Sequence, residues 1–146
     1  PVIASHSNCR ALVDTKRNLT DKQIKAIASK NGVIGMNAAS VFTANNDKKA
    51  TVESLIDHID HIVKLVGVEY VGIGFDFCDR LRQYDPQRPS KFASRKPFDV
   101  LKGHKKINEF VQALIERGYQ DKKIELILGK NFMRIYKEVL NPNKDT

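Results

Sequence analysis

Short apolar runs alternate with amphipathic stretches along this chain, and this order constrains its fold more than any other feature. Three runs rich in β-branched residues and glycine predict strands at Pro1–Ser5, Val33–Asn37 and Val68–Phe75. Between these runs, apolar residues recur every three or four positions, which is the spacing of a helix with one buried face. Strand, helix, strand and helix in this order predict parallel βαβ units. The strands are nearly continuous apolar runs, as expected for a sheet covered on both faces.

The amphipathic stretches carry the start and stop signals of helices. Thr20 and Gln23 match a capping box, and the helix that they open should end near Asn31 and Gly32. A second helix is expected from Val52 to the stop at Gly67. Three further helical stretches are expected near the end of the chain, at Ile107–Leu114, Ile124–Leu128 and Asn131–Leu140.

The positive charge of the chain is concentrated in one segment. The formal net charge is +8, and much of the excess lies between Arg80 and Lys106. This region carries three prolines, and no nucleic-acid-binding motif surrounds it. We therefore predict a basic, Pro-containing loop at residues 77–103, inside a single segment formed by residues 1–146, and no nucleic-acid partner.

Length and cysteine content indicate a single soluble domain. No apolar run approaches the roughly eighteen residues of a membrane-spanning helix, so we expect no transmembrane segment. The chain opens directly on the first apolar run, without the pattern of a secretory signal. Cys9 and Cys78 form neither a CxxC metal knuckle nor a disulfide framework, which favours reduced thiols in a cytoplasmic protein.

Two residues with chemical potential directly follow predicted strands. In parallel α/β folds, functional side chains gather at the C-terminal ends of the strands. His6 follows the first strand, where a histidine can be a metal ligand, a base or a satisfied structural residue. Asp76 follows the third strand, after a glycine-rich stretch, where a carboxylate can carry protons or bind a metal.

Arg17 and the segment from Asp57 to His61 are further candidates. Arg17 precedes the first helix, and its planar guanidinium suits bidentate binding of a substrate carboxylate; a plain surface charge is the alternative. The segment Asp57–His61 has the composition of a metal cluster. It falls inside a predicted helix with its own apolar stripe, so we favour a structural role in hydrogen bonding.

Taken together, five segments resemble the renal (membrane) dipeptidase family of zinc dipeptidases in their order and approximate spacing. The similarity runs from Pro1 almost to Leu140 and corresponds to the C-terminal portion of the family's proteins. The five segments are Pro1–Asn8, Arg17–Asp21, Asp57–Ile62, Gly72–Phe77 and Gly129–Arg134.

The resemblance implies the C-terminal part of a (β/α)8 TIM-type barrel of a metal-dependent hydrolase, with about three parallel strands and their helices supplied by this chain. It implies a dipeptide substrate and two zinc ions bridged by a glutamate and a water or hydroxide. By matched position, His6 would bind one zinc, Arg17 would hold the substrate carboxylate, and Asp76 would handle protons at the leaving amine. The family's other ligands precede the segment that Pro1 matches, so His6 is the one zinc ligand expected here.

Three positions depart from the family pattern and bear on substrate preference. Phe75 stands where the family usually has a small residue, and Cys78 and Asp79 stand where it has aspartate and glycine. We expect a zinc metallodipeptidase of which this chain supplies only part of the active site, so that the isolated chain is inactive. The N-terminal part of the same barrel, or another copy of the chain, would complete it. The alternative is a non-catalytic half-barrel that serves as a binding or structural protein.

Overall fold

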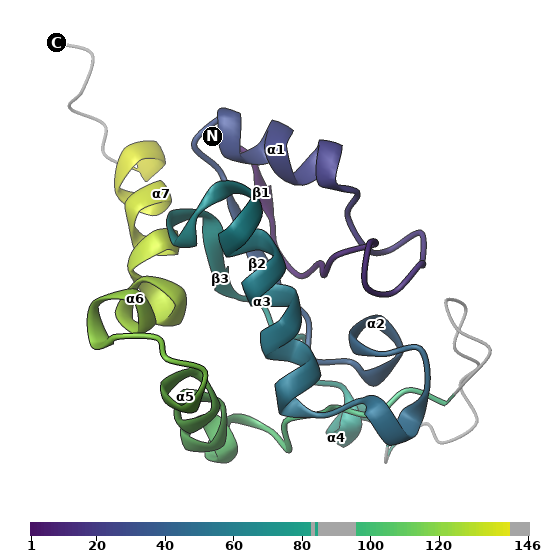
Figure 1. Cartoon of the computed structure of the whole chain (residues 1–146). Helices are drawn as coiled ribbons and strands as arrows, with labels where there is room; N and C mark the ends of the chain where they lie inside the picture. Colours follow the sequence, from purple (N-terminus) through teal and green to yellow (C-terminus); the bar gives the residue numbers. More distant parts are fainter. Residues whose placement is uncertain (83, 85–95, 141–146) are drawn as a thin grey trace, which may run out of the picture.

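In the computed structural model, a small parallel sheet is packed against a layer of helices (Figure 1). The structure describes residues 1–82, 84 and 96–140. The sheet has three strands in the order β1-β2-β3, with β1 at Ile3–Ala4, β2 at Val33–Met36 and β3 at Val71–Ile73. Both neighbouring pairs are parallel. The predicted α/β class, with three parallel strands joined by helices, is therefore confirmed.

Each strand is shorter than its apolar run. The prediction of a third strand from Val68 is wrong at its beginning, because Val68–Tyr70 form a 3-10 turn. Gly67 ends the preceding helix with a φ of 115°, a conformation that glycine adopts without strain, and the turn then returns the chain to the sheet. β1 lies at the edge of the sheet and pairs only through Ile3 and Ala4.

The helices follow the capping signals of the sequence. Thr20 caps α1, at Asp21–Ser29, through the predicted capping box, and Thr51 caps α3, at Val52–Val66, in the same way. The short helices α2 and α4 were not predicted. No helix in the described part of the chain is both long and apolar enough to cross a membrane. The remaining elements are α2 (Ser40–Thr43), α4 (Asp79–Arg82), α5 (Ile107–Glu116), α6 (Asp121–Glu125) and α7 (Asn131–Leu140), with 3-10 turns at Asp47–Lys49 and His104–Lys106 and a π-helical turn at Leu126–Lys130.

One face of the sheet and the helix layer enclose the apolar core. α3 lies between α1 and α5 and contacts both (Figure 1). Ile34 and Met36 project from β2 toward this layer and are completely buried, as are Ile59 of α3 and Phe110 of α5. Burying a side chain of this size contributes about 1.5–3 kcal/mol. This core therefore supplies most of the stability of the described part of the chain.

The opposite face of the sheet contacts α7. A Cβ atom added to Gly72 of β3 would lie 2.4 Å from the ring of Phe132, so the helix and the strand touch here without room for a side chain. Arg134 of α7 donates to the backbone carbonyls of Asn31 and Glu69, at 2.9 and 3.0 Å. These carbonyls lie shortly before β2 and β3, so Arg134 connects α7 to the N-terminal ends of these two strands.

The predicted basic loop, residues 77–103, is described only at its two ends; residues 83 and 85–95 lie outside the described part. Its ends are joined to each other by hydrogen bonds. Asp99 is 2% exposed, and its Oδ2 accepts from the backbone N–H groups of Cys78 and Asp79 at 2.9 and 2.8 Å. Asp79 Oδ1 accepts in return from the Asp99 N–H at 3.0 Å. The two described ends of the segment are thus held together at its base, and the prediction of a basic loop between them stays a prediction.

Candidate functional site

The C-terminal ends of the three strands meet at one edge of the sheet. His6, Asn37 and Asp76 follow β1, β2 and β3, respectively. Glycine allows the strand ends to approach closely, because a Cβ atom on Gly35 or Gly74 would lie 2.3 or 1.9 Å from the carbonyl oxygen that precedes His6. The parallel order and these contacts bring residues from three separate sequence segments to the same edge.

Asn37 connects the end of β2 to Asp76. Its Oδ1 accepts from the Ala39 N–H at 2.8 Å, which turns its Nδ2 group toward Asp76, and Nδ2 donates to Asp76 Oδ2 at 3.4 Å. Asn8 fixes the Asn37 backbone on both sides: its Oδ1 accepts from the Asn37 N–H at 2.9 Å, and its Nδ2 donates to the Asn37 carbonyl at 3.0 Å. Both asparagines are buried. Sequence reasoning missed their role, although Asn37 stands directly after a buried strand.

Asp76 is exposed and has a φ of 55°, in the left-handed region, which aspartate tolerates better than most residues. A cavity of about 600 Å³ lies beside it and is lined in part by Phe75, Phe77 and His104. Phe75 is 5% exposed and meets Phe110 edge-on, with ring centroids 5.2 Å apart. Phe75, at a position where a small residue was expected, therefore packs in the apolar core and also forms one wall of the cavity.

His6 is half-buried, and its Nδ1 lies 2.7 Å from the Ser5 hydroxyl oxygen. No described residue hydrogen-bonds to its Nε2. A histidine that binds a metal through one ring nitrogen usually has the other held by a hydrogen bond, so this arrangement fits a metal ligand. Within the described residues no group of three or more His, Cys, Asp or Glu side chains could hold a metal ion. The described part of the chain thus offers a candidate ligand but not a complete metal centre.

Arg17 lies in the loop between β1 and α1. Its guanidinium carbon is 5.7 Å from the centroid of the Phe42 ring, in the range of a cation–π contact. Phe42 belongs to α2, which follows Asn37 by only a few residues. The arginine is therefore on the same side of the sheet as the strand ends that carry His6 and Asp76.

His58 is a structural residue rather than a metal ligand. It is completely buried, and its Nδ1 accepts from the Cys9 N–H at 3.0 Å while its Nε2 donates to the Thr43 carbonyl at 3.1 Å. Both ring nitrogens are thereby used, and the neutral Nε2–H tautomer is selected. Burial lowers the pKa of His58 to about 4. The structural interpretation of this helix segment is confirmed.

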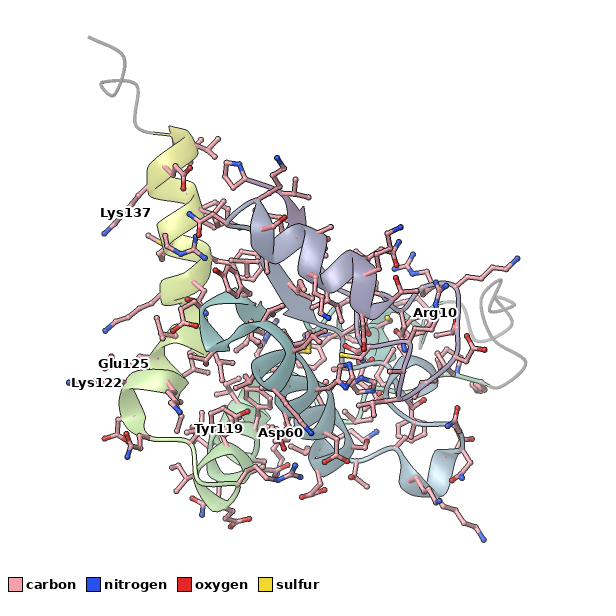
Figure 2. All side chains as sticks on the ribbon, turned by 45° about the horizontal axis from the view of Figure 1, so that its top comes forward. Arg10, Asp60, Tyr119, Lys122, Glu125 and Lys137 are labelled. Atoms are coloured by element: carbon pink, nitrogen blue, oxygen red, sulfur yellow. The ribbon has the colours of Figure 1, made fainter. Side chains whose placement is uncertain are left out.

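The other polar residues of the same helix connect neighbouring helices. His61 lies 2.7 Å from Asp21 of α1, from Nε2 to Oδ1. Asp60 accepts from the Tyr119 hydroxyl at 2.7 Å and from Arg117, and Figure 2 shows Asp60 and Tyr119 next to each other. These contacts hold α1 and the end of α5 against α3, away from the strand ends.

Comparison with known sequences identifies a family over the whole chain. The sequence model described as membrane dipeptidase (peptidase family M19) matches residues 1–146. Dipeptidase tcpJ of Claviceps purpurea is 31% identical over 139 residues, which are 95% of this chain and 29% of that protein. Dipeptidase 3 of Macaca fascicularis is 29% identical over 94% of this chain and 25% of its own length.

Solved structures agree with the fold. The probable dipeptidase PvdM of Pseudomonas aeruginosa matches with a TM-score of 0.74 and 26% identity, over 97% of this chain and 45% of that chain. A metallo peptidase of Rhodobacter sphaeroides, solved with a phosphinate mimic of the dipeptide L-Ala-D-Ala, matches in fold with a TM-score of 0.73 and 23% identity, over 94% of this chain and 36% of that chain. The chain spans less than half the length of these proteins. The expected portion of a TIM-type barrel is thereby confirmed.

Proposed function

The chain belongs to the membrane dipeptidase family, peptidase family M19, and from this premise we propose that it forms part of a zinc-dependent dipeptidase. One observation carries the proposal: His6, the Asn37–Asp76 pair and Arg17 all lie on the same side of the sheet. The dipeptidase names of the relatives support the reaction class. The proposed roles of individual residues come from the family resemblance, and their surroundings support them.

We assign His6 as the zinc ligand that this chain contributes. The Ser5 hydroxyl on Nδ1 fixes the ring and leaves Nε2 as the nitrogen that would bind the metal. Zinc, when bound, supplies an activated water and neutralises negative charge that develops on the substrate. The ligands that complete a two-zinc centre would come from outside the described residues.

We assign Arg17 to the free carboxylate of the substrate. The guanidinium of Arg17 offers two coplanar donors, which match the two oxygens of a carboxylate. The Phe42 ring contacts the guanidinium and limits its movement without neutralising its charge. Arg17 is held at a fixed distance from the metal ligand. It can therefore bind the C-terminal carboxylate of a substrate only when the scissile peptide bond lies one residue before that carboxylate. Such a geometry favours dipeptides over longer peptides.

We assign Asp76 to proton transfer at the leaving amine. Asn37 donates to one carboxylate oxygen and so sets the orientation of the group at the strand edge. A positioned carboxylate that exchanges protons with a reacting group contributes about 10²–10⁴-fold to the rate. The exposed position of Asp76 in the described residues leaves it open toward a substrate.

We propose that the rest of the barrel covers an apolar surface on this chain. β1 and β3 each have an unpaired edge in the described sheet, and unpaired edges favour association with further strands. Exposed apolar side chains lie at the start of the chain and on α7: Val2, Ile3, Met133, Tyr136, Val139 and Leu140. The partner is the N-terminal part of the same barrel or another copy of the chain. A non-catalytic half-barrel remains the competing function, and the exposed apolar surface disfavours it.

Zinc content tests the proposal directly. In the complete dipeptidase that contains this sequence, we expect native mass spectrometry to find two zinc ions, and His6→Ala to lower the occupancy by about one. His61→Ala is the matched control, because His61 is also half-buried but bonds to Asp21, and it should keep both ions. Full zinc content in His6→Ala would remove the ligand role, and absence of dipeptide hydrolysis by the zinc-loaded protein would favour the binding function.

We also propose a cytoplasmic location. The support is the reduced state of the cysteines, since the Cys9 and Cys78 thiols donate to the His58 and Asp76 carbonyls, at 3.4 and 3.0 Å. Fractionation of cells that express a tagged form would test it, and recovery in a membrane or secreted fraction would contradict it.

A further inference from the structure

A second arginine holds the loop that carries Arg17. Arg10 Nε donates to the carbonyls of Thr15 and Asn18, both at 3.1 Å, and Arg10 Nη2 donates to the Lys16 carbonyl at 3.0 Å. These carbonyls stand before and after Arg17 in the chain. One guanidinium therefore joins the backbone on both sides of the proposed substrate-binding residue. Figure 2 labels Arg10 at the rim of the molecule.

The same loop is closed at its base and attached to α2. The Leu19 N–H donates to the Asn8 carbonyl at 2.8 Å, which joins the two ends of the loop. Asn18 is 1% exposed, and its Nδ2 donates at 3.0 Å to the carbonyl of Phe42, the residue whose ring lies under Arg17. The base and the contact with α2 are thus fixed by buried groups, and Arg10 fixes the remaining outer turn.

The chemistry of the guanidinium suits this task. The turn at residues 14–18 has no helix or strand: its Thr15 carbonyl accepts from the Asn18 N–H at 3.0 Å, and Arg10 is the donor to the Lys16 and Asn18 carbonyls. Arginine carries five N–H donors in a rigid fork and can serve several carbonyls together. Lysine carries its charge on one nitrogen at the end of a flexible stem and cannot reproduce this fork. Arg10 is half-buried, which shields these bonds in part from water.

We propose that Arg10 is a positioning residue for Arg17 and thereby sets the affinity of the site for the free carboxylate of the substrate. This inference rests on the proposed function of Arg17. Arg10 Nε and Nη2 donate to backbone carbonyls, so its proposed role is to support the loop rather than to bind substrate. Its loss should let the outer turn move, so that Arg17 is less often in the binding position. The reacting atoms, which His6 and Asp76 face, should be unaffected.

Steady-state kinetics of the complete zinc-loaded enzyme test the inference. Arg10→Gln should raise KM for a dipeptide about tenfold and leave kcat within about twofold, since a ground-state contact is weakened and the chemical step is not. The same variant should leave kcat/KM for the dipeptide amide unchanged, because the amide lacks the carboxylate. Arg10→Gln combined with Arg17→Gln should be no worse than Arg17→Gln alone, because the two residues act through one contact. Arg117→Gln, which removes another arginine that binds Asp57 and Asp60, is the matched control and should keep KM.

Two outcomes separate the inference from the function on which it rests. If Arg17→Gln raises KM and Arg10→Gln does not, the positioning role is wrong and the role of Arg17 stands. If Arg17→Gln itself leaves KM unchanged, the assignment of Arg17 is wrong, and the positioning role is wrong with it. Equal losses on the dipeptide and its amide, or additive losses in the double variant, would show a general structural effect and overturn the inference.

Limited proteolysis gives a readout that does not depend on activity. Trypsin cleaves after Lys16 and Arg17, which lie in the turn that Arg10 holds. Arg10→Lys keeps the charge and most of the volume, so it serves if Arg10→Gln does not fold. We expect cleavage at these two bonds to become at least about fivefold faster in Arg10→Lys, with other tryptic sites unchanged, because local opening rather than global unfolding admits the protease. Unchanged cleavage at both bonds would contradict the positioning role.

Discussion

Acidification should destabilise the folded chain through His58. Protonation of Nδ1 would place an N–H group against the Cys9 N–H, at a site where the two nitrogens are now 3.0 Å apart. The Nε2–H bond to the Thr43 carbonyl would persist, so a single contact changes from hydrogen bond to repulsion. The imidazolium would also be buried completely, since His58 is 0% exposed.

The pKa of His58 gives the size and the pH window of this effect. Its value in the folded protein is lowered to about 4, mainly by burial, from 6.5. The unfolded chain therefore binds more protons than the folded chain between these two values. The stabilising contribution is fully present above pH 6.5 and is lost as the pH falls toward 4. A shift of this size corresponds to about 3 kcal/mol, which is a large part of the ~5–15 kcal/mol that stabilises a typical domain.

Urea denaturation at a series of pH values measures the effect. The free energy of unfolding should fall by up to about 1.4 kcal/mol per pH unit from His58 alone across the window. His58→Gln, which cannot titrate, should be less stable at pH 7 and should lack this component of the pH dependence. His61→Gln, which removes a half-buried histidine from the same helix, is the control and should keep it. Identical pH profiles for the parent protein and His58→Gln would refute the reasoning.

Three further predictions concern the site and its support. Asn37→Ala should lower kcat at least about tenfold with a small change in KM, because Asp76 loses the donor that orients it; steady-state kinetics check this, and a change confined to KM would contradict it. Gly74→Ala should lower the free energy of unfolding by at least about 2 kcal/mol, because its Cβ would lie 1.9 Å from the Ser5 carbonyl oxygen, whereas Gly129→Ala meets no atom within 4 Å and should be tolerated in a thermal melt. Burial and Asp21 raise the pKa of the Cys9 thiol to about 12, so iodoacetamide at neutral pH should modify Cys9 only after unfolding, as mass spectrometry of the peptides would show.

The elements of the fold could be predicted because their signals are local. Neighbouring residues alone predict the capping box at Thr20, the helix end at Gly67 and the apolar stripe of α3. Each of these features appears where it is expected. The end of the third strand could be placed, but its beginning could not, because the 3-10 turn at Val68–Tyr70 satisfies an apolar pattern equally well. The course of α7 along the far face of the sheet also escaped prediction, since it depends on a contact between Phe132 and Gly72 that is distant in sequence.

The candidate site divides in the same way. His6 and Asp76 could be selected because they follow strands, and the resemblance of whole segments added Arg17. Asn37 and Arg10 could not be selected, because their roles are hydrogen bonds to one carboxylate oxygen and to backbone carbonyls. A sequence shows the residue type that donates such a bond but not the acceptor that the fold places beside it.

Stability and chemistry depend on different parts of this chain. The core residues that α1, α3 and α5 enclose are completely buried by the chain itself, and His58 ties that core to the loop after β1. By contrast, His6 and Arg17 are half-buried and Asp76 is exposed. Substitutions at His58 should therefore change the free energy of unfolding, whereas substitutions at His6, Arg17 or Asp76 should change zinc binding or turnover at nearly constant stability. A large fall in the free energy of unfolding in Asp76→Asn would show that residues at the strand ends contribute to the stability of this chain. The candidate site would then belong to the folded core rather than to its exposed margin.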